Sequence, residues 1–308
     1  MEIGIIGLGR MGLNMTERWL RSSHRVVAYN RSPGPVAEAV AKGAVGAASL
    51  PDLVGKLEQP AGRRVLWTMV PAGAVTENMI MQLIPLLDRG DVIVDGGNAN
   101  YKDSQRRSEM LAAEGLEFLD CGTSGGVWGL ANGYSLMIGG DRRVYERIEP
   151  LFQALAPGPD RGLGLVGPAG AGHFTKMIHN GIEYGMMQAM AEGFEIMAKK
   201  SEMDLDLAQV GQIWRYGSVI QSWLLDLAVR ALEEDPRLER LEAYVADSGE
   251  GRWTVQEAID LDSPAEVLSL ALLRRFRSRD PSPFSERMLA ALRQQFGGHA
   301  VRPREQQQ

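Results

Sequence analysis

The first half of the chain alternates short apolar runs with longer stretches of mixed character. The apolar runs are rich in Val, Ile and Leu, and they lie at residues 3–6, 26–29, 65–70, 92–95, 116–120 and 135–138. Short buried strands separated by helical stretches are typical of a parallel sheet with crossover helices. The pattern therefore predicts an N-terminal α/β domain.

The pattern changes in the second half. From Lys176 onward, long segments rich in Ala, Leu, Met and Glu contain few β-branched residues, which predicts an all-α C-terminal domain. A Gly- and Pro-rich stretch at residues 157–172 separates the two regions and reads as the junction. We therefore predict one domain at residues 1–170 and a helical domain at residues 171–308.

A glycine motif follows the first predicted strand directly. Its residues are Gly7-Leu8-Gly9-Arg10-Met11-Gly12, and residues 13–20 after it can form a helix. In this context the first glycine permits a tight turn, the second admits a pyrophosphate, and the third lets helix and strand pack closely. Glycine turns after strands are common, but the strand, turn and helix together predict a dinucleotide-binding domain of the Rossmann type.

The second predicted strand ends at Asn30-Arg31-Ser32. At this position a carboxylate would hold the 2'-hydroxyl of NAD, whereas an arginine suits the 2'-phosphate of NADP. The residues favour NADP. NAD stays open, because an asparagine can also bind a bare ribose and a loop arginine can simply be solvated.

Three further loops follow predicted strands, at the edge where open α/β sheets bind ligands. They contain Val70-Pro71-Ala72, Gly96-Gly97-Asn98 and Ser124-Gly125-Gly126. Each could be an ordinary turn, since Gly, Asn and Ser dominate turns for backbone reasons. Their shared position is the stronger indication of a binding site.

Composition limits the partners and the chemistry. A net charge of -6 gives no general affinity for nucleic acid or anionic membranes. The single Cys121 cannot form an intrachain disulfide or build a thiol metal site, so we expect a reducing compartment and no metal. Since the N-terminus lacks signal-peptide character and no apolar run is long enough to span a membrane, we expect a cytoplasmic protein.

Residues 170–185 combine an amine, an imidazole, an amide, a carboxylate and a phenol. At helical spacing Lys176, His179, Asn180 and Glu183 share one face, with about 10 Å of rise between the lysine and Glu183. An ordinary exposed helix pair is the usual alternative for Lys and Glu. Here the neighbouring His179, Asn180 and Tyr184 favour acid and base chemistry on a small polar substrate.

These motifs together resemble 6-phosphogluconate dehydrogenase, decarboxylating, in the short form of the family. The resemblance rests on residues 176–185, on Asp95-Gly96-Gly97-Asn98 and on Ser124-Gly125-Gly126. It implies oxidative decarboxylation of 6-phosphogluconate to ribulose 5-phosphate and CO₂ with NADP or NAD, in the pentose phosphate pathway and gluconate utilisation. Lys176 would be the general base and Glu183 the general acid.

The resemblance also implies two sets of binding residues. Cofactor contacts would come from Gly7, Leu8, Gly9, Arg10, Met11, Gly12, Asn30, Arg31, Ser32, Val70, Pro71, Ala72 and Asn98. Sugar-acid contacts would come from Asn98, Ser124, Gly125, Gly126, His179, Asn180 and Tyr184.

The substrate phosphate should be held by arginines, whose fork geometry suits it. The resemblance implies Arg275, although Arg274, Arg277 and Arg279 crowd the same segment. It also implies that residues 171–308 form the substrate and oligomerisation domain of a homo-oligomer, in which Arg293 and His299 reach the active site of a neighbouring subunit. The alternative is a basic C-terminal helix end that only complements the helix dipole.

One segment departs from the family pattern. Ser248 and Glu250 stand where long family members carry a lysine and a threonine on the substrate phosphate, so phosphate binding should depend more on the arginines.

Two other functions stay open at this point. A related β-hydroxyacid dehydrogenase would oxidise a small hydroxy acid without decarboxylation, and Glu183 argues against it because that reaction needs no enediol protonation. A regulatory protein that senses the nicotinamide redox state without turnover is a second alternative, which Lys176 and Glu183 together disfavour.

Overall fold

The computed structural model describes residues 1–60, 62–297, 300 and 302. The chain divides into two compact units, unit 1 from Met1 to His179 and unit 2 from Asn180 to Gln308. This division falls inside helix α8 (Ala171–Lys199), which belongs to both units. The domain boundary expected after residue 170 stays a prediction; residue 171 is where α8 begins.

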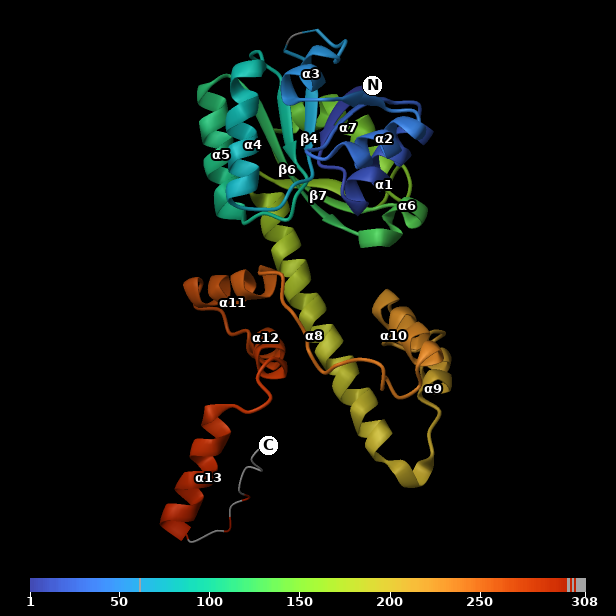
Figure 1. Cartoon of the computed structure of the whole chain (residues 1–308), viewed down its shortest axis with the longest axis vertical. Coiled ribbons are helices and arrows are strands. Elements are labelled where there is room, and N and C mark those ends of the chain that lie inside the picture. The colour runs from blue at the N-terminus through green and yellow to red at the C-terminus, as the bar shows by residue number, and fades with distance from the viewer. Residues whose placement is uncertain (61, 298–299, 301, 303–308) are drawn as a thin grey trace. The chain divides into compact units, whose positions relative to one another are not determined.

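The described residues of unit 1 form an eight-stranded sheet in the order β3-β2-β1-β4-β5-β6-β7-β8 (Figure 1). The strands are β1 (Glu2–Ile6), β2 (Arg25–Tyr29), β3 (Val45–Ala47), β4 (Val65–Thr68), β5 (Val92–Asp95), β6 (Glu117–Ser124), β7 (Ser135–Gly140) and β8 (Leu163–Gly167). All neighbours are parallel except β6 and β7, which pair antiparallel. The predicted Rossmann-type sheet is confirmed.

Each of the six predicted apolar runs overlaps a strand, and the structure shows two further strands that the apolar pattern did not predict. β3 is three residues long and contains a glycine, so it carries too little apolar pattern to be found. β8 lies inside the Gly- and Pro-rich stretch that we read as the junction. Its five residues are two glycines, two leucines and one valine, and its pairing with β7 rather than its own pattern makes it a strand.

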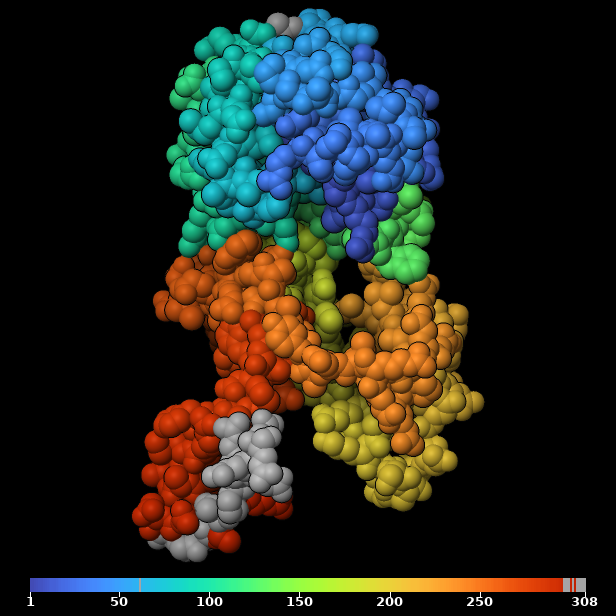
Figure 2. Space-filling model, viewed as in Figure 1, coloured from blue at the N-terminus to red at the C-terminus, as the bar shows by residue number. Residues whose placement is uncertain are grey.

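Helices cover both faces of the sheet. They are α1 (Arg10–Arg21), α2 (Pro33–Ala41), α3 (Leu50–Gly55), α4 (Ala74–Leu83), α5 (Tyr101–Ala113), α6 (Gly129–Asn132) and α7 (Arg142–Leu155), with short 3₁₀ turns η1 (Ile84–Leu86) and η2 (Gly126–Trp128). On the face seen in Figure 2, helices and loops of unit 1, coloured blue to green, cover the strands.

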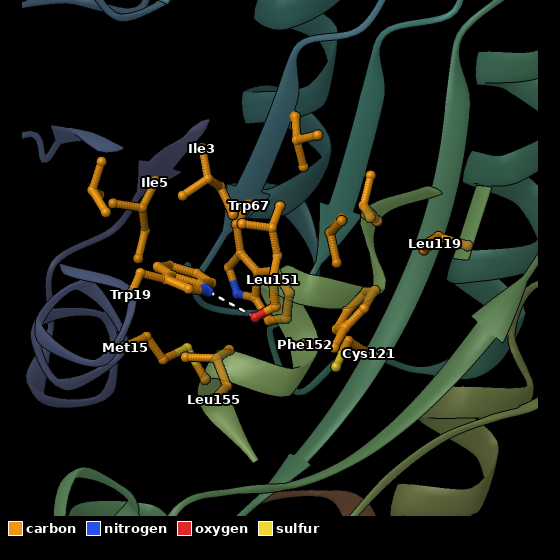
Figure 3. Packing of buried hydrophobic residues seen from close by; sticks show 14 of the residues in the cluster. Ile3, Ile5, Met15, Trp19, Trp67, Leu119, Cys121, Leu151, Phe152 and Leu155 are labelled. Atoms are coloured by element: carbon orange, nitrogen blue, oxygen red, sulfur yellow. Dashed lines mark hydrogen bonds between the residues drawn. The ribbon is translucent and has the colours of Figure 1, made fainter. Parts of the chain in front are cut away.

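Side chains alternate between two cores, one on each face of the sheet. Along β1, Ile3 and Ile5 enter one core and Ile6 enters the other. In the first core the ring of Trp19 meets that of Trp67 edge-on, with centroids 5.3 Å apart, and its Nε1 donates to the carbonyl of Leu151 at 2.8 Å (Figure 3). The buried indole thus meets its one polar requirement while its ring fills the core.

The described residues of unit 2 are helical, as predicted. After α8 come the 3₁₀ turn η3 (Ser201–Met203), α9 (Leu207–Trp214), α10 (Trp223–Glu234), α11 (Glu250–Asp260), α12 (Glu266–Ser278) and α13 (Phe284–Gly297). Asp206 and Ser222 begin α9 and α10 by accepting backbone N–H groups of the first turn. A small core joins Tyr184 of α8 to Ala271 and Leu272 of α12.

Candidate active site

The turn between β1 and α1 has the backbone shape that a dinucleotide needs. Gly7 has φ +99°, and a Cβ there would lie 2.3 Å from the Met69 carbonyl oxygen. A Cβ on Gly12 would lie 2.1 Å from the Gly7 carbonyl oxygen, so neither position admits a side chain. Gly9 is different, because a Cβ built there meets nothing within 4 Å.

Gly9 also begins α1, and its helix start has no side-chain cap. Arg10 and Met11 form the first turn, and Arg10 is exposed. Backbone N–H groups at such an end attract anions, and the open space above Gly9 lets a pyrophosphate approach them. The residues present therefore fit a dinucleotide.

The end of β2 is tied to this turn. The Leu8 N–H donates to Asn30 Oδ1 at 3.0 Å, and Asn30 Nδ2 donates to the carbonyl and the hydroxyl of Ser32 at 3.2 and 2.9 Å. Both ends of the Asn30 amide are thus engaged within the protein. Arg31 is exposed beside them.

The loops after β4 and β5 lie next to each other, because these strands pair in parallel from Val65 with Val92 to Thr68 with Asp95. Pro71, Ala72 and Asn98 are exposed on these loops, and Val70 is half-buried. Gly96 fits closely over Trp67, since a Cβ there would lie 2.2 Å from the indole Nε1. These loops bring the predicted Val70, Pro71, Ala72 and Asn98 to one edge of the sheet.

Lys176 lies buried at the end of β6, with 7% of its surface exposed. Its Nζ is 3.4 Å from His179 Nδ1, and His179 Nε2 is 3.3 Å from the hydroxyl of Ser124. A Cβ on Gly122 of β6 would lie 2.4 Å from Lys176 Cβ, so α8 packs directly on the strand there. Three predicted residues, Ser124, Lys176 and His179, therefore form one hydrogen-bonded chain.

Ser124 ends β6, and the two glycines after it have φ +131° at Gly125 and φ +51° at Gly126. A side chain would strain both positions, because this is backbone that L residues rarely adopt. Their backbone therefore turns sharply beside Ser124.

A buried carboxylate fixes the start of α8. Asp120 accepts the backbone N–H groups of Gly170 at 2.6 Å and of His173 at 2.7 Å, and it is completely buried. His173 Nδ1 lies 2.6 Å from the Ser104 hydroxyl. Lys176 is one turn further along α8, so Asp120 and His173 fix the start of the helix that carries this lysine. Neither residue is among the site residues predicted from the sequence.

The unit 2 portion of α8 carries Asn180, Glu183 and Tyr184. Asn180 and Glu183 are half-buried, and Tyr184 is 6% exposed. The Tyr184 hydroxyl accepts the Ser248 N–H at 3.4 Å. The Arg275 guanidinium carbon lies 3.4 Å from the centre of the Tyr184 ring, and its Nη1 donates to the Ala246 carbonyl at 2.8 Å.

The arginines of unit 2 differ in their partners. Arg252 and Arg279 both pair with Asp247, and they hold the pKa of that carboxyl at about 2. Arg277 pairs with Glu286 at 2.9 Å. Within the described part of the chain, Arg275 has no carboxylate partner, and with Arg274 it lines a pocket of about 270 Å³ beside Tyr184 and Met187.

Two further predicted residues lie near the C-terminus. Arg293 is exposed on α13, whereas His299 lies outside the described residues. Ser248 and Glu250 are within hydrogen-bonding distance of each other, and Glu250 is buried. Glu250 is therefore turned into the protein at the segment that departs from the family pattern.

Two other features are absent from the described residues. They contain no cluster of His, Cys, Asp and Glu that could hold a metal ion. Among the same residues, no helix combines the length and the apolar character needed to cross a bilayer. Cys121 is buried, which raises the pKa of its thiol far above the ordinary value.

A dinucleotide turn at the edge of a parallel sheet, followed by a helix with a buried lysine, is the architecture of a nicotinamide-dependent dehydrogenase. Residues 2–167 match the family profile described as the NAD binding domain of 6-phosphogluconate dehydrogenase, and residues 172–307 match that of its C-terminal domain. The chain belongs to the 6-phosphogluconate dehydrogenase family.

Individual relatives agree with this assignment. The NAD⁺-dependent, decarboxylating 6-phosphogluconate dehydrogenase of Haloferax volcanii is 45% identical over 302 residues, covering 98% of each chain. The decarboxylating enzyme 2 of Saccharomyces cerevisiae is 36% identical, and the match covers 94% of this chain but 61% of the yeast protein. This chain thus has the length of the short relatives.

Solved structures show the same relationship. The 6-phosphogluconate dehydrogenase of Plasmodium falciparum, described with NADP⁺ and with 6-phosphogluconate, matches with a TM-score of 0.83 at 26% identity, covering 99% of this chain and 67% of that one. A 3-hydroxyisobutyrate dehydrogenase of Mycobacterium tuberculosis shares the fold, with a TM-score of 0.70 at 22% identity over 88% of this chain and 90% of the other.

Proposed function

We propose that this protein catalyses the oxidative decarboxylation of 6-phosphogluconate to ribulose 5-phosphate and CO₂, with NADP or NAD as cofactor. The observation that carries the proposal is the buried Lys176, hydrogen-bonded to His179 on a helix that also carries Glu183. Seven helical positions separate Lys176 from Glu183, which gives about 10 Å along the axis and room for a sugar acid. A β-hydroxyacid dehydrogenase would not need Glu183.

The proposed roles follow from the chemistry of each group. A nicotinamide cofactor bound at the turn between β1 and α1 would supply the acceptor for the hydride that leaves C3 of the sugar acid. Lys176 Nζ takes the proton of the C3 hydroxyl, and as an ammonium it then donates a hydrogen bond to the new C3 carbonyl oxygen. This polarisation lets the bond between C1 and C2 break, so that CO₂ leaves, the electron pair of that bond moves towards the C3 oxygen, and Lys176 returns its proton there to give the enediol. Glu183 then protonates the carbon that becomes C1 of the product while Lys176 takes the proton back from the enediol oxygen, which leaves the ketone.

The remaining polar groups would hold the substrate. His179 contacts both Lys176 and Ser124, so it can orient the lysine while Ser124, Gly125, Gly126, Asn98 and Asn180 bind the sugar acid. This role for His179 is supported by its position between the predicted base Lys176 and the predicted substrate residue Ser124.

Arg275 is the proposed phosphate ligand. Arg252, Arg277 and Arg279 are each paired with a carboxylate, whereas Arg275 stacks on the predicted substrate residue Tyr184. A guanidinium without a competing carboxylate can form the bidentate contact that a phosphate favours. Arg274 lines the same pocket and is the second candidate.

NADP is the proposed preferred cofactor. Exposed Arg31 suits a 2'-phosphate, and the internal hydrogen bonds of Asn30 occupy the amide that could otherwise bind a bare ribose. The Haloferax volcanii relative is named as NAD⁺-dependent, so both cofactors belong in the first assay.

The active enzyme is proposed to be a cytoplasmic homo-oligomer in which Arg293 and His299 reach the site of a neighbouring subunit. The test is a mixture of Lys176→Ala and Arg293→Ala proteins: activity should return on mixing, because one mixed site would keep both residues. If mixing restores no activity, the tail does not act across subunits.

One assay tests the central proposal. Initial rates with 6-phosphogluconate are followed by reduced cofactor and by released CO₂ together, with NADP and NAD in parallel. Equal amounts of both products are expected, and NADP should give the higher kcat/KM. Reduced cofactor without CO₂ would instead favour the β-hydroxyacid reaction, and no turnover with any sugar acid would favour a redox-sensing protein.

A further inference from the structure

Arg107 on α5 is a fully buried cation that the proposed chemistry does not use. Its side chain has no exposed surface. Nη1 donates to Asp95 Oδ2 at 3.1 Å, Nε donates to Glu77 Oε2 at 3.1 Å, and Nη2 donates to the Gly73 carbonyl at 3.4 Å. One guanidinium therefore joins the end of β5 to the first turn of α4 and to Gly73, the residue before α4.

These partners belong to the two loops that carry Val70, Pro71, Ala72 and Asn98. Gly73 ends the first loop, with φ +82°, and Asp95 begins the second. The other oxygen of Asp95 accepts the Gly97 N–H at 3.1 Å and lies 3.4 Å from the Thr68 hydroxyl at the end of β4. The Arg107 and Asp95 pair thus connects both loops, and the helices that carry Glu77 and Arg107, α4 and α5, lie side by side in Figure 1.

A buried ion pair is a costly way to stabilise a fold, because desolvation offsets most of the attraction and an apolar core often does as well. A guanidinium does offer donors in three fixed directions, which a lysine ammonium on a flexible stem does not reproduce. The three partners of Arg107 use three different nitrogens. These contacts therefore fix the positions of Asp95, Glu77 and Gly73 relative to one another more than they stabilise the fold.

We infer that Arg107 is a positioning residue for cofactor binding, which sets the spacing of the loops at residues 69–73 and 96–98. It does not touch the cofactor, since it has no exposed surface. This inference rests on the proposed cofactor roles of Val70, Pro71, Ala72 and Asn98.

The adjacent Arg106 supplies a matched control. It is on the same helix, carries the same charge and binds the same Glu77, at 2.7 and 2.8 Å, but it is 53% exposed and contacts neither Asp95 nor Gly73. The two variants are Arg107→Lys and Arg106→Lys in the full chain. NADP and NAD affinities are measured by calorimetry without sugar acid, and KM is measured for the cofactor and for 6-phosphogluconate.

Arg107→Lys should weaken cofactor binding about tenfold or more, because it loses hydrogen bonds between charged groups. KM for 6-phosphogluconate should rise less than KM for the cofactor, because Asn98 is the only residue of these two loops that is also proposed to bind the sugar acid. Both cofactor affinities of Arg106→Lys should stay within about twofold of the original protein. A purely structural role would lower stability without this split between the two substrates. Calorimetry needs no turnover, so a failure of the proposed reaction would be seen separately.

Two results would overturn the inference: unchanged cofactor affinity in folded Arg107→Lys, or an equal loss in Arg106→Lys. If Arg107→Lys does not fold, Asp95→Asn takes its place, since it keeps the shape of the side chain and removes the charge. Weaker cofactor binding by Asp95→Asn supports the role of the pair, and unchanged binding contradicts it.

Discussion

The unit 1 and unit 2 portions of α8 hold their functional side chains in different ways. In unit 1, Lys176 is buried against Gly122, and Asp120 fixes the start of its helix. In unit 2, Tyr184 supports Arg275, whose guanidinium stays on the wall of an open pocket. The proposed proton-transfer group is thus held by close packing, whereas the proposed anion-binding group is held by one stacked face and keeps its donors accessible.

The largest expected effect is at Lys176. Lys176→Ala removes the proposed base and should lower kcat by about 10³-fold or more, while cofactor affinity stays unchanged. Lys199→Ala, at the exposed end of the same helix, is the control. Turnover within tenfold of the original protein would show that Lys176 is not the base.

The second largest effect is expected at Glu183. Glu183→Gln should lower kcat about 10²-fold with little change in KM for 6-phosphogluconate. The amide keeps the size of the side chain but has no proton to give. Steady-state rates with simultaneous measurement of CO₂ test this, and Glu202→Gln on the surface serves for comparison. Full activity of Glu183→Gln would refute its role as the acid.

Arg275→Met tests whether the accessible guanidinium on the pocket wall of unit 2 binds the substrate phosphate. It should raise KM for 6-phosphogluconate about 10- to 100-fold, because a charge-assisted contact is lost. Any turnover of gluconate, which has no phosphate, should change far less. Arg277→Met removes a neighbouring arginine that is already paired with Glu286. Equal effects of both variants would mean that general charge, rather than Arg275, attracts the phosphate.

Gly122→Ala tests the close packing around Lys176. A Cβ there would lie 2.4 Å from Lys176 Cβ, so the helix must shift, and we expect a loss of about 1 to 3 kcal/mol in unfolding free energy together with reduced kcat. A Cβ on Gly164 in β8 meets nothing within 4 Å, so Gly164→Ala should change neither the unfolding free energy nor kcat. Urea unfolding and initial rates decide, and unchanged kcat in Gly122→Ala would show that the lysine tolerates displacement.

The smallest effect concerns the pH dependence of stability. Arg252 and then Arg279 lower the pKa of Asp247 to about 2, below the unfolded value near 4. The carboxylate therefore contributes stability above about pH 4, and this contribution, at most about 2 kcal/mol, is lost as the pH falls towards 2. Urea unfolding at pH 7 and pH 3 should show a smaller difference for Asp247→Asn than for the original protein.

Local patterns in the sequence were enough for several features. The alternation of apolar runs predicted six strands, and the glycine motif predicted the turn where Gly7 and Gly12 exclude any side chain. The chain of Ser124, His179 and Lys176 also joins residues that we selected from sequence. In each case neighbouring positions in the chain carry the information, because turn geometry and helical spacing are local.

Other features could not be found in this way. Nothing around Arg107 distinguishes it from Arg106, yet one is buried and the other exposed. The four crowded arginines of α12 and its end look alike in sequence. Only the structure pairs Arg277 with Glu286 and Arg279 with Asp247, which separates these two from Arg274 and Arg275.

The sequence by itself therefore determined the class of fold and the family, and it singled out the residues that we propose to move protons or to bind a dinucleotide. Tertiary structure decided which of these side chains are buried, which arginines are already paired, that Asp120 holds the start of α8, and that Arg107 joins the loops at residues 69–73 and 96–98. The reason is physical: burial and pairing depend on contacts between residues far apart in the chain, and such contacts leave no periodic or local signal.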